Sequence, residues 1–154
     1  MSLVLSEDQQ LLKDSAKAFV DQNAPVSVLR GLRDSKDAQG YDQNLWRQML
    51  ELGWAGMAIP EAYGGFEFGY GGLGVVLEEM GRSLLCAPFF STVVLAANAL
   101  IQSGDESAKK EYLPGIASGA TIATLALTEP SGKWDEAGIT LPAANNGGSW
   151  SLTG

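Results

Sequence analysis

The chain has 154 residues, of which 45% are hydrophobic and 18% charged, the composition of a globular protein with a buried core. Its formal net charge of −8 argues against nucleic acid or an anionic membrane as the main partner, because both attract clustered basic residues. There is no histidine, and Cys86 is the single cysteine, which within these residues excludes an internal disulfide, a histidine-dependent catalytic triad and a histidine or structural zinc site. We therefore expect no bound metal.

The sequence shows neither a visible signal peptide nor a predicted membrane span. The N-terminus lacks the basic region of a signal peptide, and no apolar run reaches the roughly 20 residues that cross a bilayer. Cys86 lies in an apolar stretch without cationic neighbours, which predicts a buried, unreactive thiol. We expect a cytoplasmic protein without a membrane span.

Helical signals dominate the chain from its start. Ser6 and Gln9 form a capping box in front of apolar residues at helical spacing, which predicts a helix over residues 7–22. After a break at an Asn-Ala-Pro sequence, helical spacing resumes and predicts a second helix over residues 26–40. A third helix is predicted over residues 42–53, with an aspartate at its start and a glycine at its end.

A glycine pattern in the middle of the chain invites a nucleotide-binding interpretation, which we reject. Gly69, Gly71 and Gly74 match G-x-G-x-x-G, but no convincing strand leads into the motif and another helix follows the first. A flexible glycine loop that enters a helix over residues 73–85 is the preferred interpretation.

The next segment, residues 89–103, is almost wholly apolar and predicts a central helix of a bundle. We favour core packing over the alternative that this helix lines an acyl cavity, in which case Phe90 and Val94 are the candidate substrate contacts. A charged helix over residues 106–113 follows, and Pro114 is predicted to end it.

The pattern then changes from helical to extended. Residues 123–127 form a short apolar run that predicts one buried strand, which Pro130 ends. Thr128 falls at the exit of this strand, where a hydroxyl and unpaired backbone N–H groups can bind the polar edge of a flat ring. The alternative is an ordinary strand end followed by a turn.

The remaining residues predict a second strand over 139–141 and a hairpin around an Asn-Asn-Gly-Gly turn at 145–148. Three short strands cannot bury both faces of a sheet, so we expect the natural protein to continue beyond this N-terminal part. The predicted fold is mainly α: a bundle of about six helices over residues 1–119, then the first strands of a β-barrel-like domain over 120–154.

Four motifs occur in the order found in one known family. They are IPEAYGG at residues 59–65, EEMG at 78–81, GDE through KEYLP at 104–114, and LTEP at 127–130. Each motif alone is weak, but their order and spacing across nearly all of the chain are specific. The chain resembles the N-terminal portion of an acyl-CoA dehydrogenase.

This resemblance implies a helical domain, a middle β domain and a C-terminal helical bundle, with FAD bound between the last two. It also implies a homo- or hetero-tetramer, an acyl-CoA substrate and an acceptor similar to electron-transfer flavoprotein. By resemblance, Leu125, Leu127 and Thr128 contact the flavin. The catalytic base of the family is a glutamate in the C-terminal bundle, outside this chain, so no catalytic residue is assigned here.

Two departures from the family pattern affect the predicted site. The family often reads TEPxAGSD, whereas residues 128–135 read TEPSGKWD, so that Trp134 replaces a serine that bonds the flavin phosphate and lies near the thioester. We therefore expect Trp134 to lie near the substrate. Leu125 stands where an aromatic residue is common, and Glu129 is rejected as a local base.

These departures leave other functions open. The alternatives are a non-catalytic partner subunit of a mixed oligomer, a helical interaction module without a cofactor, and an oxidase or monooxygenase of the same fold.

Overall fold

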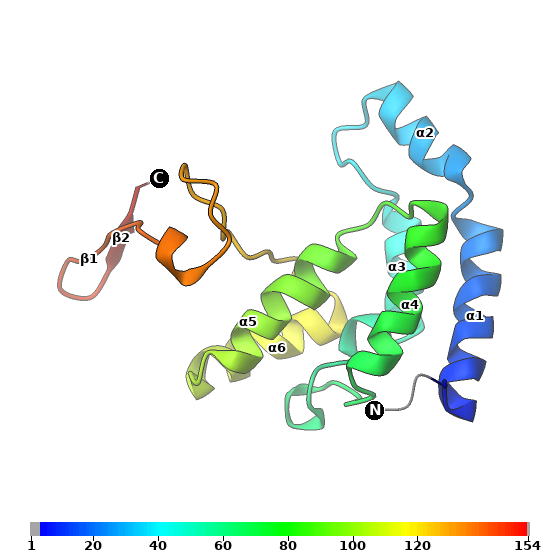
Figure 1. Ribbon diagram of the computed structural model, residues 1–154, viewed down its shortest axis with the longest axis horizontal. Helices are drawn as coiled ribbons and strands as arrows, with labels where there is room; N and C mark the ends of the chain where they lie inside the picture. Colours follow the sequence, from blue (N-terminus) through cyan, green and yellow to red (C-terminus); the bar gives the residue numbers. More distant parts are fainter. Residues whose placement is uncertain (1–3, 154) are drawn as a thin grey trace. The chain divides into compact units, whose positions relative to one another are not determined.

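The structure, a computed structural model, describes residues 4–153 and divides them into two compact units, one ending at Thr124 and the other beginning at Leu125. The first unit is helical (Figure 1). Its helices are α1 (Glu7–Asn23), α2 (Val26–Ser35), α3 (Gln43–Glu51), η1 (Trp54–Gly56), η2 (Glu61–Tyr63), α4 (Tyr70–Ser83), the π-helix η3 (Phe90–Ala96), α5 (Ala97–Gln102) and α6 (Glu106–Ser118).

Local capping sets where several helices begin, as the sequence predicts. The Ser6 side chain accepts the Gln9 N–H at the start of α1, and the Gln9 side chain accepts the Ser6 N–H in return. Asp42 accepts two backbone N–H groups at the start of α3, and Asp105 does the same for α6. Each carboxylate or hydroxyl satisfies donors that have no partner within the helix.

The predicted glycine loop is partly wrong, because α4 begins at Tyr70 rather than at residue 73 and includes Gly71 and Gly74. Two predicted helix ends are also wrong. Helix α2 ends at Ser35 rather than near residue 40, because the Asp37 carboxylate accepts the Gln39 and Gly40 N–H groups and so stabilises a turn instead. Helix α6 continues through Pro114 to Ser118. Packing accounts for this second difference, since the helix on both sides of the proline contributes fully buried leucine and isoleucine side chains to the core.

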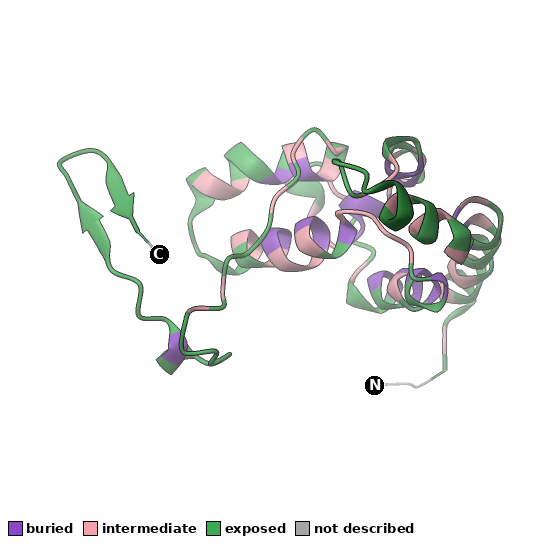
Figure 2. Cartoon of the chain, turned by 90° about the horizontal axis from the view of Figure 1, so that it is seen from above, coloured by how far each residue is buried: buried purple, intermediate pink, exposed green. Residues whose placement is uncertain are grey.

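Two apolar clusters form the core of the helical unit. The larger one joins α1, α3, α4 and the start of the apolar segment at residues 89–96, and its members include Trp46, Met49, Trp54, Val76, Phe89 and Val93. The smaller one consists of Ile59, Ala97, Leu113 and Ile116. Figure 2 shows the buried residues in bands along the helices of this unit. Core packing of the segment 89–103 is therefore observed at Phe89, Val93 and Ala97.

Cys86 corrects a further prediction. The thiol is half-buried rather than buried and donates to the Gly40 carbonyl oxygen at a distance of 3.0 Å, because it lies in the irregular segment after α4.

The second unit contains η4 (Glu136–Gly138) and an antiparallel pair of strands, β1 (Ala143–Asn145) and β2 (Trp150–Leu152). Ala143 lies opposite Leu152 in the register, and two glycines with positive φ form the turn of the predicted hairpin. The predicted strands at 123–127 and 139–141 are wrong. A strand needs a partner, and β1 and β2 pair only with each other in the part of the chain that is described.

The predicted fold class is confirmed, since the structure is mainly α-helical with two short strands at its C-terminal end. No helix within residues 4–153 combines the length and the apolar character that crossing a membrane requires.

Candidate functional site

One buried hydroxyl fixes the start of the segment that carries the predicted flavin contacts. Thr92 of η3 is completely buried, and its Oγ1 donates to the Ala123 carbonyl oxygen at 3.0 Å and accepts from the Ala123 N–H at 3.2 Å. Within residues 4–153, Ala123 is the one residue between Thr121 and Glu129 whose backbone forms a hydrogen bond. Thr92 therefore fixes this extended backbone at a single point.

The π-helix that carries Thr92 is supported at its other end by a side-chain pair. The Tyr70 hydroxyl donates to Asn98 Oδ1 at 2.5 Å, and Asn98 Nδ2 donates to the Val94 carbonyl oxygen at 2.6 Å. The wider turn of a π-helix disturbs the regular backbone ladder, and such turns occur frequently at functional sites. Tyr70 and Asn98 thereby stabilise the C-terminal half of the π-helix η3.

The predicted flavin contacts lie on one irregular segment of the second unit. Leu125 is 40% exposed, Leu127 is half-buried and Thr128 is exposed. These side chains and their backbone N–H groups form no hydrogen bond with other residues in 4–153. The segment therefore offers two apolar side chains, one hydroxyl and several donors to a ligand with a flat ring and a polar edge.

Glu129, directly after Thr128, is held by four hydrogen bonds. Its Oε1 and Oε2 both accept the Thr140 N–H at 2.9 Å, Oε1 accepts the Leu141 N–H at 2.9 Å, and Oε2 accepts the Thr140 hydroxyl at 2.5 Å. The hydroxyl bond from Thr140 and then the backbone bonds from Leu141 and Thr140 lower the pKa of the Glu129 carboxyl. Glu129 is thus a half-buried anchor between two parts of the second unit.

The three predicted substrate contacts differ in their local surroundings. Phe90 is 55% exposed and borders a cavity of about 350 Å³ together with Leu77 and Leu84. Val94 packs against the larger core cluster instead. Trp134, in the second unit, is 78% exposed. The roles of these three residues stay predictions.

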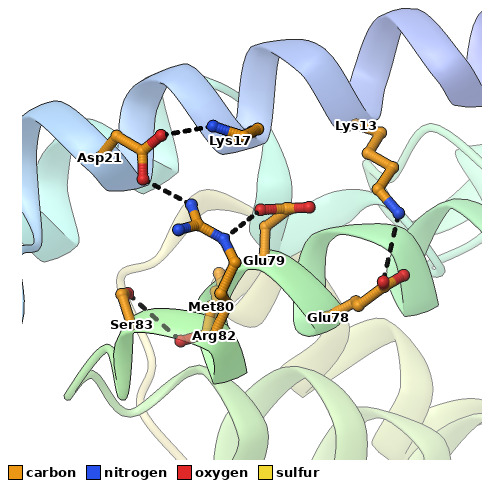
Figure 3. A network of polar contacts seen from close by, with 8 residues as sticks. All are labelled: Lys13, Lys17, Asp21, Glu78, Glu79, Met80, Arg82 and Ser83. Carbon is orange, nitrogen blue, oxygen red and sulfur yellow. Dashed lines mark hydrogen bonds and ion pairs between the residues drawn. The ribbon is translucent and has the colours of Figure 1, made fainter.

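A network of charged residues joins α1 to α4 in the helical unit (Figure 3). Arg82 binds the Asp21 carboxylate at 2.5 Å and the almost fully buried Glu79 carboxylate at 2.8 Å, and Lys17 binds Asp21 at 2.7 Å. Hydrogen bonds from Lys17 and then from Arg82 lower the pKa of Asp21. Every charge in this network has a partner, which indicates a structural role rather than a catalytic one.

The acidic and cysteine side chains of the described residues do not gather into a cluster. No group of three or more histidine, cysteine, aspartate or glutamate side chains in residues 4–153 could hold a metal ion.

Sequence reasoning missed two anchors, Thr92 and the pair Glu129–Thr140. The presence of a threonine inside the apolar run weakly indicated a buried hydrogen bond at Thr92. No local pattern indicates the contact of Glu129 with Thr140, because the two residues are 11 positions apart.

Comparison with known proteins gives a family match over the helical unit and single relatives that extend further. The family model described as "Acyl-CoA dehydrogenase, N-terminal domain" matches residues 6–120. The chain is 37% identical over 122 residues to acyl-CoA dehydrogenase IpdE2 of Mycolicibacterium smegmatis, a match that covers 79% of this chain and 37% of that relative.

Solved structures agree with the sequence comparison. The ChsE4–ChsE5 complex from Mycobacterium tuberculosis matches with a TM-score of 0.83 at 31% identity, over 100% of this chain and 40% of that one. A glutaryl-CoA dehydrogenase from Mycobacterium smegmatis in complex with FADH2 matches with a TM-score of 0.80 at 26% identity, over 97% of this chain and 38% of that one. The chain therefore spans well under half the length of these proteins.

Proposed function

Because this chain belongs to the acyl-CoA dehydrogenase family through its N-terminal domain, we propose that it forms the N-terminal part of an FAD-dependent acyl-CoA dehydrogenase. In this proposal residues 1–119 are the helical domain, residues 120–154 begin the β domain, and the complete protein desaturates an acyl-CoA thioester between its α and β carbons. The observation that carries the proposal is the family match over residues 6–120.

Leu125, Leu127 and Thr128 are the proposed flavin contacts. The exposure of Leu125 and Thr128 and the lack of hydrogen-bond partners for all three N–H groups within residues 4–153 fit a ring with an apolar body and a polar edge. When bound, FAD supplies an acceptor for the hydride that leaves the β carbon. The Thr128 hydroxyl and nearby N–H groups would donate to the polar edge of the ring, where fixed donors stabilise developing negative charge.

The substrate contacts and the base belong to the same proposal. Phe90, Val94 and Trp134 are proposed to contact the acyl-CoA, and the base is proposed to be a glutamate outside these residues. Glu129 is a poor candidate for the base, because both of its carboxylate oxygens accept hydrogen bonds and its pKa is lowered, whereas a general base at neutral pH benefits from a raised carboxyl pKa.

We further propose a cytoplasmic oligomer, either a homo-tetramer or a hetero-tetramer, that passes electrons to an acceptor similar to electron-transfer flavoprotein. Similarity to a complex of two named chains, ChsE4 and ChsE5, favours the mixed form. In a mixed oligomer, a second function is that the chain serves as a non-catalytic subunit. Trp134 supports this alternative, because its indole cannot replace the serine hydroxyl that bonds the flavin phosphate in the family pattern.

The experiment is purification of the complete protein, alone and with candidate partner chains, followed by its visible absorption spectrum and its mass in solution. Flavin absorption that co-purifies with a tetramer, together with reduction of the flavin by an acyl-CoA, supports the enzyme. A flavin-containing tetramer that forms only with a second chain supports a mixed oligomer. A colourless protein that does not take up added FAD contradicts the proposed function.

A further inference from the structure

The carboxylate of Glu129 binds residues further along the chain and so closes a loop. Its four hydrogen bonds reach Thr140 and Leu141, so residues 129 and 140 are held together although ten residues separate them in the sequence. Consecutive backbone N–H groups that converge on one carboxylate form a compact anion-binding arrangement. We call residues 129–140 the 129–140 loop.

The interior of the 129–140 loop is ordered by further contacts. The Gly132 N–H donates to the Glu129 carbonyl oxygen at 2.9 Å, in a turn where Gly132 has a positive φ of 66°. Gly138 is buried, and an added Cβ at this position would lie 2.7 Å from Lys133 Cβ and 2.8 Å from the Lys133 carbonyl oxygen. Adjoining ends and internal packing are the features of a compact Ω-type loop.

We propose that Glu129 is a positioning residue, whose carboxylate closes the 129–140 loop and thereby fixes the adjacent Thr128 for flavin binding. This inference rests in part on the proposed function, since the flavin role of Thr128 belongs to it. The closing of the loop depends only on the contacts of Glu129, which are independent of any ligand.

An ionised carboxylate matches these contacts best, because it accepts at both oxygens and its charge strengthens each hydrogen bond. Thr140 and Leu141 present three donors to Glu129, and an ionised carboxylate has acceptors only. A glutamine of the same shape can keep the backbone N–H bonds at its amide oxygen, and its NH2 group can donate to the Thr140 hydroxyl, but it loses the charge that strengthens these bonds. The lowered pKa of Glu129 agrees with this, because the surrounding donors favour the charged form.

The sequence provides a protease site that reports on the loop. Lys133 is the only lysine or arginine after Lys110, so trypsin has a single target in this part of the chain, the bond between Lys133 and Trp134. A protease needs an extended backbone, and a closed loop resists cleavage until it opens. The peptide that begins with Trp134 can be followed by mass spectrometry during brief digestion of the complete protein.

The decisive variant is Glu129→Gln, and the matched control is Glu136→Gln. Glu136 lies in the same loop and is exposed, and its carboxylate has no hydrogen-bond partner in residues 4–153, so its substitution removes the same charge without removing contacts. Loss of charge-assisted hydrogen bonds predicts cleavage about tenfold faster in Glu129→Gln and unchanged in Glu136→Gln. Thr140→Val, which retains the backbone donors, should give a smaller increase.

A second measurement uses FAD titration of the same proteins. Glu129→Gln is expected to bind FAD about tenfold more weakly than the wild type, with Glu136→Gln unchanged. Cleavage of Glu129→Gln at the wild-type rate overturns loop closure by Glu129. Faster cleavage with unchanged FAD affinity overturns the positioning role. A wild-type protein that binds no FAD overturns the proposed function and the positioning role together, whereas the proteolysis comparison still decides loop closure.

Discussion

Replacing Thr92 by valine removes one hydroxyl from the interior of the helical unit and leaves the shape of the side chain almost unchanged. The Ala123 N–H and carbonyl oxygen both lose their partner, at a place where the backbone from residues 122 to 128 has no other hydrogen bond among the described residues. Each hydrogen bond contributes a net of about 0.5–1.5 kcal/mol. The expected loss of stability is therefore about 1–3 kcal/mol for Thr92→Val.

Two measurements on the complete protein test this prediction. Urea unfolding gives the loss of stability, and hydrogen exchange at the Ala123 amide reports the local contact. Ser91→Ala is the matched control, because the Ser91 hydroxyl donates only to the carbonyl oxygen of Pro88, three residues earlier, and its loss should cost at most about 0.5 kcal/mol. Thr92→Ser, which retains the hydroxyl, should keep the Ala123 amide protected. Unchanged protection of that amide in Thr92→Val would refute the reasoning.

Three other predictions concern the core, the charged network and pH. Phe89→Ala is expected to cost about 3–5 kcal/mol in urea unfolding, and Phe90→Ala, at an exposed neighbour, less than about 1 kcal/mol. Arg82→Gln is expected to raise the pKa of Asp21 towards 3.8 in an NMR titration, because one of its two cationic partners is lost. The pKa of Glu129 is lowered in the folded protein. The ionised carboxylate therefore stabilises the 129–140 loop fully at pH values above 4.5, the ordinary pKa of glutamate, and this stabilisation is lost as the pH falls through the lowered pKa. Loop amide protection should therefore persist at pH 5 and disappear at lower pH, with a midpoint below 4.5.

Each of these predictions would be contradicted by a specific result. Equal costs for the two phenylalanine substitutions would mean that the burial in the structure is wrong. An Asp21 pKa that does not respond to Arg82→Gln would remove that ion pair from the account. Loop protection that disappears above pH 4.5 would show that another group holds the loop.

Much of the helical unit could be predicted because its signals are local. The caps at Ser6, Asp42 and Asp105 each concern residues within three positions, and amphipathic spacing then sets the buried face. The hairpin turn is equally local. Pro114 misled the prediction, since the loss of one helical hydrogen bond was outweighed by packing that a single sequence does not display.

The rest depends on contacts between distant residues. The strand predicted at 123–127 did not form because strand formation needs a partner that this part of the chain does not provide. The hydrogen bonds of Thr92 join it to Ala123, which is 31 residues away in the sequence. The contacts of Glu129 form only when the loop brings Thr140 back to it. A glutamate in a turn is common, so the sequence around Glu129 did not predict these contacts.

The central claim is that Thr128 contributes to flavin binding in the complete protein. The most direct measurement is the FAD dissociation constant of the wild type, of Thr128→Val and of Thr124→Val as a control, each obtained by titration of the flavin-free protein. Loss of one hydrogen bond predicts affinity about tenfold weaker for Thr128→Val and unchanged for Thr124→Val. Equal affinity of all three proteins, or no FAD binding by the wild type, would contradict the claim.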